Sequence, residues 1–133
     1  MPTELISGIW IGNIYDLFIN DFINDNLIDI IINCTEDIGF PNIPNIQKVR
    51  IPFSKNKTNF QLLKDNQKNI LDFLNQNIEN KNIFIICYNG ISISPLIVAL
   101  YIKEYYHIDN KNIIDSFKSK NKDIFIDQII INF

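Results

Sequence analysis

Two short apolar runs rich in β-branched residues are the clearest signals in the pattern of hydrophobic and polar positions. Leu27–Asn33 (LIDIIIN) and Ile83–Cys87 (IFIIC) are each bounded by polar residues, which is typical of strands buried on both faces of a parallel sheet. Gly8–Gly12 (GIWIG) and Gln47–Phe53 (QKVRIPF) fit shorter strands. Pro52 places the end of the last strand near a turn or a sheet edge.

The segments between and after these strands have the spacing of helices. Apolar residues from Phe60 to Ile78 recur close to the helical period and predict an amphipathic helix. Pro95–Tyr105 opens with proline and continues so apolar that we expect a central, buried helix. Asn110–Lys118 and Asp123–Asn132 each carry one apolar face and are predicted as two further helices. Strands that alternate with helices predict one α/β domain over residues 1–133 with a largely parallel sheet.

Composition and charge narrow the function classes. The chain has 133 residues, 47% of them hydrophobic and 20% charged, with a formal net charge of −3, values typical of one soluble globular domain. Without an excess of basic residues, we expect no nucleic-acid partner. The longest apolar run, Leu96–Ile102, is far shorter than the roughly 18 residues that span a bilayer, and Met1–Ile6 has no signal-peptide pattern. We therefore expect no membrane association and a cytoplasmic protein.

The chain has few residues suited to metal or redox chemistry. Cys34 and Cys87 follow the two apolar strands, and without a secretory signal we expect both to be free thiols in a reducing compartment. His107 is the single histidine, so the sequence predicts no metal site and no other cofactor. Arg50 is the single arginine.

The segment from Ile83 to Leu100 is the strongest functional signal. A buried strand ends at Cys87, a short loop contains Gly90, and Pro95 opens a helix. Successive backbone amides of such a loop can point inward above a helix N-terminus and form a nest that binds anions. Taken alone, Cys87 is better explained as a buried cysteine at the end of a strand, and only the order of the surrounding segments reverses that preference.

The order of the segments resembles that of the dual-specificity phosphatases, a family of the cysteine-dependent protein tyrosine phosphatase superfamily with compact members in cells and in large DNA viruses. The resemblance implies a central, mostly parallel sheet of about five strands flanked by α-helices, and the host cytoplasm as location for a viral member. It rests on the segments Ser7–Asn13 (SGIWIGN), Asp29–Asp37 (DIIINCTED), Val49–Phe53 (VRIPF), Tyr88–Pro95 (YNGISISP) and Asn121–Ile129 (NKDIFIDQI).

The family signature is His, Cys, five residues, Arg, and then Ser or Thr. The resemblance implies that Cys87 holds the position of the nucleophile, which attacks phosphorus, and that Ser94 holds the position of the hydroxyl that assists hydrolysis. The phosphate loop between them consists of Tyr88, Asn89, Gly90, Ile91, Ser92 and Ile93. We expect Ser92 to bond loop amides or to cap the following helix.

Three positions depart from the signature. Ile86 replaces the histidine, Ile93 replaces the arginine, and Lys55 or a neighbour stands where the family has its general-acid aspartate. No Asp or Glu occurs between Asp37 and Asp65, so a small shift of the alignment does not restore the acid. Removing one transition-state donor costs about 3–4 kcal/mol, and losing a general acid costs on the order of a hundredfold in rate or more.

These losses predict a pseudophosphatase that binds or regulates a protein partner, whether phosphorylated or not. Tyr88, Asn89 and Ile91 would line the mouth of the site. Lys55 and Lys57 could supply positive charge to an acidic ligand, although lysines in a polar loop are more often simply solvated. One alternative is a weakly active protein phosphatase that uses Cys87. A second is a thiol redox sensor, because the resemblance includes relatives that form a disulfide between the nucleophile and a cysteine in the position of Cys34. The sequence leaves the oligomeric state open.

Overall fold

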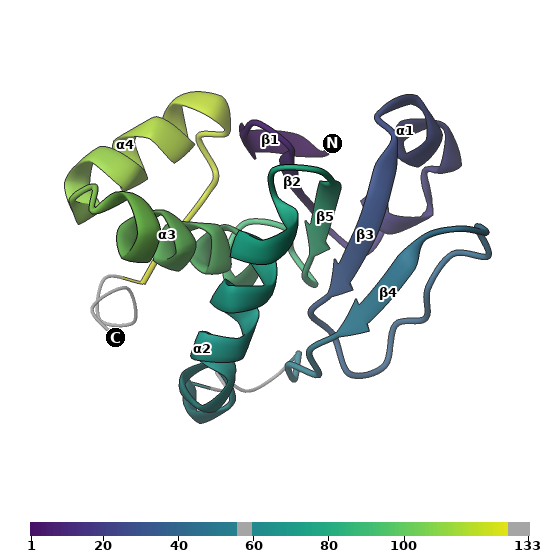
Figure 1. Cartoon of the computed structure of the whole chain (residues 1–133), viewed down its shortest axis with the longest axis horizontal. Helices are drawn as coiled ribbons and strands as arrows, with labels where there is room; N and C mark the ends of the chain where they lie inside the picture. Colours follow the sequence, from purple (N-terminus) through teal and green to yellow (C-terminus); the bar gives the residue numbers. More distant parts are fainter. Residues whose placement is uncertain (56–59, 128–133) are drawn as a thin grey trace.

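The computed structural model describes residues 1–55 and 60–127 of the chain, and its centre is a five-stranded sheet (Figure 1). The strands lie in the order β1-β2-β5-β3-β4; β1 is antiparallel to β2 and the other neighbours are parallel. The mostly parallel sheet predicted from the sequence is therefore confirmed. The strands are β1 (Thr3–Ile6), β2 (Ile9–Gly12), β3 (Ile28–Asn33), β4 (Gln47–Arg50) and β5 (Asn82–Ile86).

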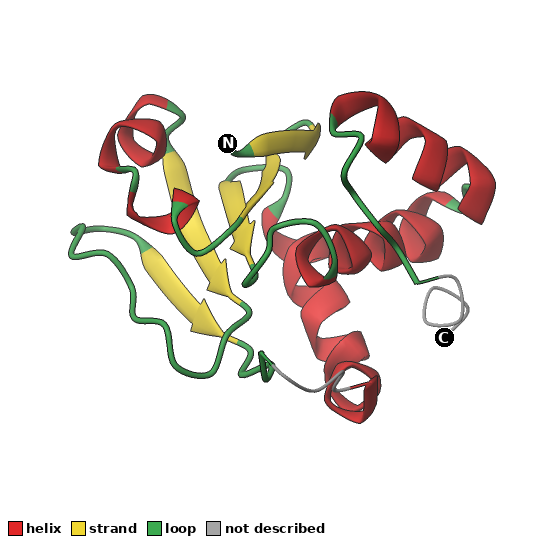
Figure 2. Ribbon diagram, turned by 180° about the vertical axis from the view of Figure 1, so that it is seen from behind, coloured by secondary structure: helices red, strands yellow, loops and turns green. Residues whose placement is uncertain are grey.

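Helices cover both faces of the sheet (Figures 1 and 2). The long helices α2 (Phe60–Asn77), α3 (Ile93–Tyr106) and α4 (Asn110–Lys120) lie on one side, where they bury the larger apolar core. The 3-10 turn η1 (Asp16–Phe18) and the short helix α1 (Asn20–Asp25) cover a smaller apolar cluster on the other face. Within the described residues, no helix is both long enough and apolar enough to cross a membrane.

Several predicted boundaries shift in the structure. The strand expected over Gln47–Phe53 ends at Arg50, two residues before Pro52, whose nitrogen cannot donate to a neighbouring strand. Helix α3 begins at Ile93, so Pro95 lies inside its first turn instead of opening it. The short elements β1 and α1 were missed because four and six residues carry too little periodicity to stand out.

The prediction of a helix over Asp123–Asn132 is wrong for the part that the structure describes. Residues 123–127 are not helical, and the remaining residues of that segment lie outside the described chain. Ile124 and Ile126 are buried while Phe125 between them is 64% exposed, the alternation of an extended segment. The Phe125 amide donates to the carbonyl oxygen of Ile91 at 2.9 Å, so this segment lies against the loop that follows β5.

Candidate functional site

The candidate site is the Cys87 loop (residues 87–94), which connects the central strand β5 to helix α3. The amide of Cys87 donates to the carbonyl oxygen of Gly12 at 3.1 Å, and the amide of Cys34 donates to that of Ile86 at 2.8 Å. These bonds continue the pairing of β5 with β2 and β3 past the end of the strand. The cysteine is therefore held at the carboxyl end of the sheet, and it is 2% exposed.

Gly90 allows the loop to turn tightly against the end of β2. Its φ of +72° lies in the left-handed region that favours glycine. A Cβ atom at this position would lie 2.8 Å from the amide nitrogen of Asn13 and 2.9 Å from the carbonyl carbon of Gly12. Because both of these atoms are backbone, they cannot rotate away, and the loop needs a glycine here.

The Cys87 sulfur faces the first turn of α3. Its Sγ lies 3.2 Å from the hydroxyl oxygen of Ser94, and the Ser94 amide donates to the same sulfur at 3.4 Å. Ser94 is fully buried. The structure thus brings together the two residues to which the resemblance assigned the nucleophile and the assisting hydroxyl.

The side chain of Asn89 occupies the amides of the loop. Its Oδ1 accepts hydrogen bonds from the amide of Ile91 at 3.0 Å, the amide of Ser92 at 3.2 Å and the Ser92 hydroxyl at 3.0 Å. The Cys87 thiol also donates to this oxygen, at 3.6 Å. Two amides expected to bind an anion therefore hold a neutral carboxamide oxygen.

The contacts of Asn89 correct the predicted role of Ser92 and make Asn89 itself a residue that shapes the site. Ser92 precedes α3, but its side chain makes no capping bond, and its hydroxyl donates to Asn89 instead of bonding loop amides. Asn89 was expected only to line the mouth of the site, and its bonds to Ile91 and Ser92 were not foreseen. The Asn89–Gly90 pair is a turn signal, and in such turns the asparagine oxygen commonly bonds the amides that follow it. This pair is the feature of the sequence from which the bonds of Asn89 could have been predicted.

The two isoleucines at signature positions both make apolar contacts. Ile86 is fully buried in the cluster beneath α1, together with Leu17, Ile23 and Phe84. Ile93 is half-buried and packs against the main core on the other face of the sheet. Neither position supplies a charge or a hydrogen-bond donor from its side chain.

Arg50 has a structural role in the turn that follows β3. Its guanidinium donates to the carbonyl oxygens of Thr35 and Ile38, both at 2.8 Å, and lies 5.1 Å from the centre of the Phe40 ring. The single arginine thus holds the connection between β3 and β4. Because the guanidinium donates to these backbone oxygens, it is already bonded within the turn.

Carboxylates lie beside the mouth of the loop. The Tyr88 hydroxyl donates to Asp37, which follows β3 and is exposed. Partial burial is the first cause that raises the pKa of Tyr88, and the hydrogen bond to Asp37 is the second. A backbone hydrogen bond at Glu36 acts in the opposite direction, while the charges of Asp37 and Glu36 both raise the pKa. The surroundings of Tyr88 are therefore acidic, which the sequence alone did not indicate.

The remaining predicted site residues are Cys34, Lys55 and Lys57. Cys34 is fully buried; burial, with a smaller contribution from Cys87, raises its pKa well above the ordinary value of a thiol. Both cysteines are free. Lys55 is exposed after β4, and Lys57 lies outside the described residues. Across residues 1–55 and 60–127, no three His, Cys, Asp or Glu side chains gather to hold a metal ion.

Comparisons with known proteins identify the family of this chain. The family model for the dual-specificity phosphatase catalytic domain matches residues 9–129. The chain belongs to the dual-specificity phosphatase family. No curated protein sequence matches it.

Solved structures agree with this dual-specificity phosphatase fold. DUSP15 superposes with a TM-score of 0.84 at 21% identity, covering 98% of this chain and 83% of its own. Human DUSP28 gives 0.77 at 10% identity, with coverage of 98% and 88%. The human tyrosine phosphatase-like serine/threonine/tyrosine-interacting protein gives 0.74 at 14% identity, with coverage of 98% and 91%. At these identities the likeness describes the fold alone.

Proposed function

We propose that this member of the dual-specificity phosphatase family is a pseudophosphatase, which keeps the fold and the cysteine but binds a protein partner without turning over phosphate. One observation carries the proposal. The loop amides of Ile91 and Ser92 are bonded to the Asn89 oxygen at 3.0 and 3.2 Å, in a loop whose arginine position is Ile93.

A phosphate group entering this loop meets two penalties. It must displace the Asn89 oxygen from its donors, and it then finds no guanidinium, because Arg50 is bonded to the carbonyls of Thr35 and Ile38. A buried anion without a compensating cation is strongly disfavoured. Loss of one transition-state donor costs about 3–4 kcal/mol, and a missing general acid lowers the rate by a further ~10²–10⁴-fold.

The charge around the mouth favours recognition that does not depend on phosphate. The Asp37 carboxylate bonds Tyr88, and Glu36 lies close enough to affect the same tyrosine. Both carboxylates repel a phosphate dianion. The proposed partner is therefore a protein recognised through its surface, whether or not it is phosphorylated. Two free cysteines support a reducing compartment, the cytoplasm of the cell or of a host.

Turnover of an aryl phosphate tests the loss of activity. We expect the wild-type protein to hydrolyse p-nitrophenyl phosphate no faster than the Cys87→Ser variant. The reason is that Cys87 acts without the arginine and the general acid that turnover requires. A rate that approaches that of active family members and disappears in Cys87→Ser would overturn the proposal.

Binding of inorganic phosphate tests the blocked loop directly. The melting temperature of the wild-type protein should not change with phosphate. The double variant Asn89→Ala, Ile93→Arg frees two amides and supplies a guanidinium, so its melting temperature should rise by several degrees at about 100 times its Kd. Ser119→Arg adds the same charge on exposed α4 and serves as the control. Stabilisation of the wild-type protein by phosphate, matching that of the double variant, contradicts a blocked loop.

Two alternatives have specific observations in their favour. The contact of Cys87 with Ser94 at 3.2 Å preserves the pair needed for a weak phosphatase, which the aryl phosphate assay would detect. The position of Cys34 favours a thiol redox sensor, because its amide bonds the carbonyl oxygen of Ile86, the residue before Cys87, at 2.8 Å; the raised pKa of the Cys34 thiol opposes this alternative. Counting thiols by mass spectrometry after mild peroxide decides this second alternative, since an intramolecular bridge that reforms reversibly is its required result.

A further inference from the structure

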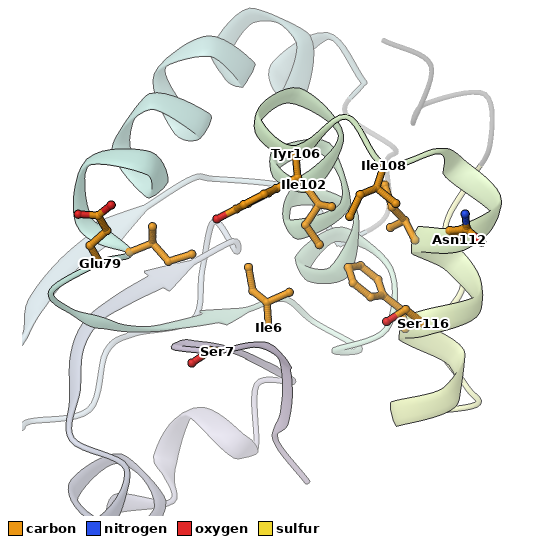
Figure 3. A pocket seen from close by; sticks show the side chains of 11 residues that line it. Ile6, Ser7, Glu79, Ile102, Tyr106, Ile108, Asn112 and Ser116 are labelled. Atoms are coloured by element: carbon orange, nitrogen blue, oxygen red, sulfur yellow. The ribbon is translucent and has the colours of Figure 1, made fainter.

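A second cavity lies away from the Cys87 loop, between the end of β1 and the helices α3 and α4 (Figure 3). Its volume is about 450 Å³, within the usual range of pockets for small molecules. Its walls are mostly apolar, with Ile6 from β1, Ile102 from α3, Phe117 from α4 and Ile108 from the connection between these helices. We call this cavity the α3–α4 pocket.

The turn between the two helices leaves apolar surface uncovered at the rim of this pocket. Helix α3 ends at Tyr106 and is followed by His107, whose φ of 55° is left-handed. Helix α4 begins after Asp109, whose side chain accepts the Asn112 amide at 2.8 Å. Between them Ile108 is 42% exposed, and Tyr106 in the last turn of α3 is 57% exposed. Exposed apolar side chains around a concave surface are typical of binding sites.

The pocket has one charged end. Of the residues that the structure describes around the cavity, Glu79 is the only charged one, and its side chain is exposed to solvent. The hydroxyl of Tyr106 points toward the side on which Glu79 lies (Figure 3). Asn112 and Ser116 lie at the opposite side, on α4. Among the described residues, no lysine or arginine lines the pocket, so the end near Glu79 favours a positively charged or hydrogen-bond-donating group.

We propose that the α3–α4 pocket binds a small amphipathic amine, with its apolar body against the isoleucine walls and its ammonium group beside Glu79. A ligand with a carboxylate head would face the Glu79 charge, and a ligand without an apolar body would leave Ile102 and Phe117 uncovered. The α3–α4 pocket shares no lining residue with the Cys87 loop, so ligand binding there is tested separately from the proposed function.

A homologous series of probes tests the chemistry of this ligand. Hexylamine and octylamine, with octanol and octanoate as neutral and anionic counterparts, are titrated into the full chain labelled at the isoleucine methyl groups. Affinity for the amines should rise by up to about fourfold for each added methylene. Octylamine should bind more tightly than octanol and octanoate least tightly, and the methyl signals of Ile6, Ile102 and Ile108 should shift.

Two variants locate the site. Glu79→Gln should weaken octylamine by about two- to fivefold, as for an exposed ion pair, and leave octanol unchanged. Ser116→Trp places a ring at the rim of the pocket and should abolish binding, whereas Ser119→Trp, on the same helix but not lining the pocket, should not. Equal affinity for all three head groups, or binding that persists in Ser116→Trp, overturns the proposal.

Discussion

Replacing Gly90 by alanine perturbs the contact that sets the shape of the Cys87 loop. The residue has a φ of +72°, and an added Cβ would lie 2.8 Å from the Asn13 nitrogen, closer than real Cβ atoms approach other heavy atoms. Asn13 is itself fixed, because its amide donates to the Asp16 carboxylate at 3.0 Å. The end of β2 therefore cannot move aside without breaking a further contact.

The expected loss of stability combines two costs in the folded state with one smaller gain from the unfolded chain. A left-handed conformation costs an alanine about 1–2 kcal/mol, and forcing a methyl group into packed backbone costs about 1–3 kcal/mol. The reduced freedom of the unfolded chain returns about 0.4–1 kcal/mol. The free energy of unfolding should therefore fall by roughly 1–4.5 kcal/mol.

Urea denaturation followed by circular dichroism measures this change. Gly39→Ala is the matched control: its added Cβ meets no atom within 4 Å, and its φ lies outside the left-handed region. We expect that variant to be as stable as the wild-type protein or slightly more stable. A Gly90→Ala variant within about 0.5 kcal/mol of the wild-type protein, the usual range of neutral surface substitutions, would refute the close approach of the loop to β2.

Three further predictions concern Arg50 and two ionisable groups. Arg50→Lys cannot bridge both loop carbonyls and should lower the free energy of unfolding by about 1–2 kcal/mol, whereas Lys48→Gln on the same strand should not change it. Burial, with the hydrogen bond to Tyr106, raises the pKa of Tyr101. Stability should therefore fall above about pH 10, where the unfolded chain releases the proton, and Tyr101→Phe should lessen that fall in alkaline melts. The hydrogen bonds from Lys68 and Tyr105 lower the pKa of Asp72, so its stabilising effect should be complete above about pH 4 and lost at lower pH. Asp72→Asn should flatten this acid limb of the melting curve, and an unchanged limb would contradict the assignment.

Local pattern was enough to place the elements that carry the Cys87 loop. The runs LIDIIIN and IFIIC predicted the buried strands β3 and β5, and the glycine and proline after Cys87 predicted the turn into a helix. Such runs are informative because burial on both faces selects β-branched residues. The same regularity misled at residues 123–127, where apolar residues were assigned to a helix but alternate along an extended segment.

The sequence by itself determined the family of the fold, the place of Cys87 at the end of a central strand, and the apolar residues at positions 86 and 93. Only the tertiary structure decided which atoms the backbone amides of the Cys87 loop bond. The bonds from Ile91 and Ser92 to Asn89 and the approach of Gly90 to Asn13 depend on backbone directions. Residue type does not encode those directions, because the same asparagine and glycine fit several turns. The partners of Arg50 depend in the same way on the connection that folds beside it.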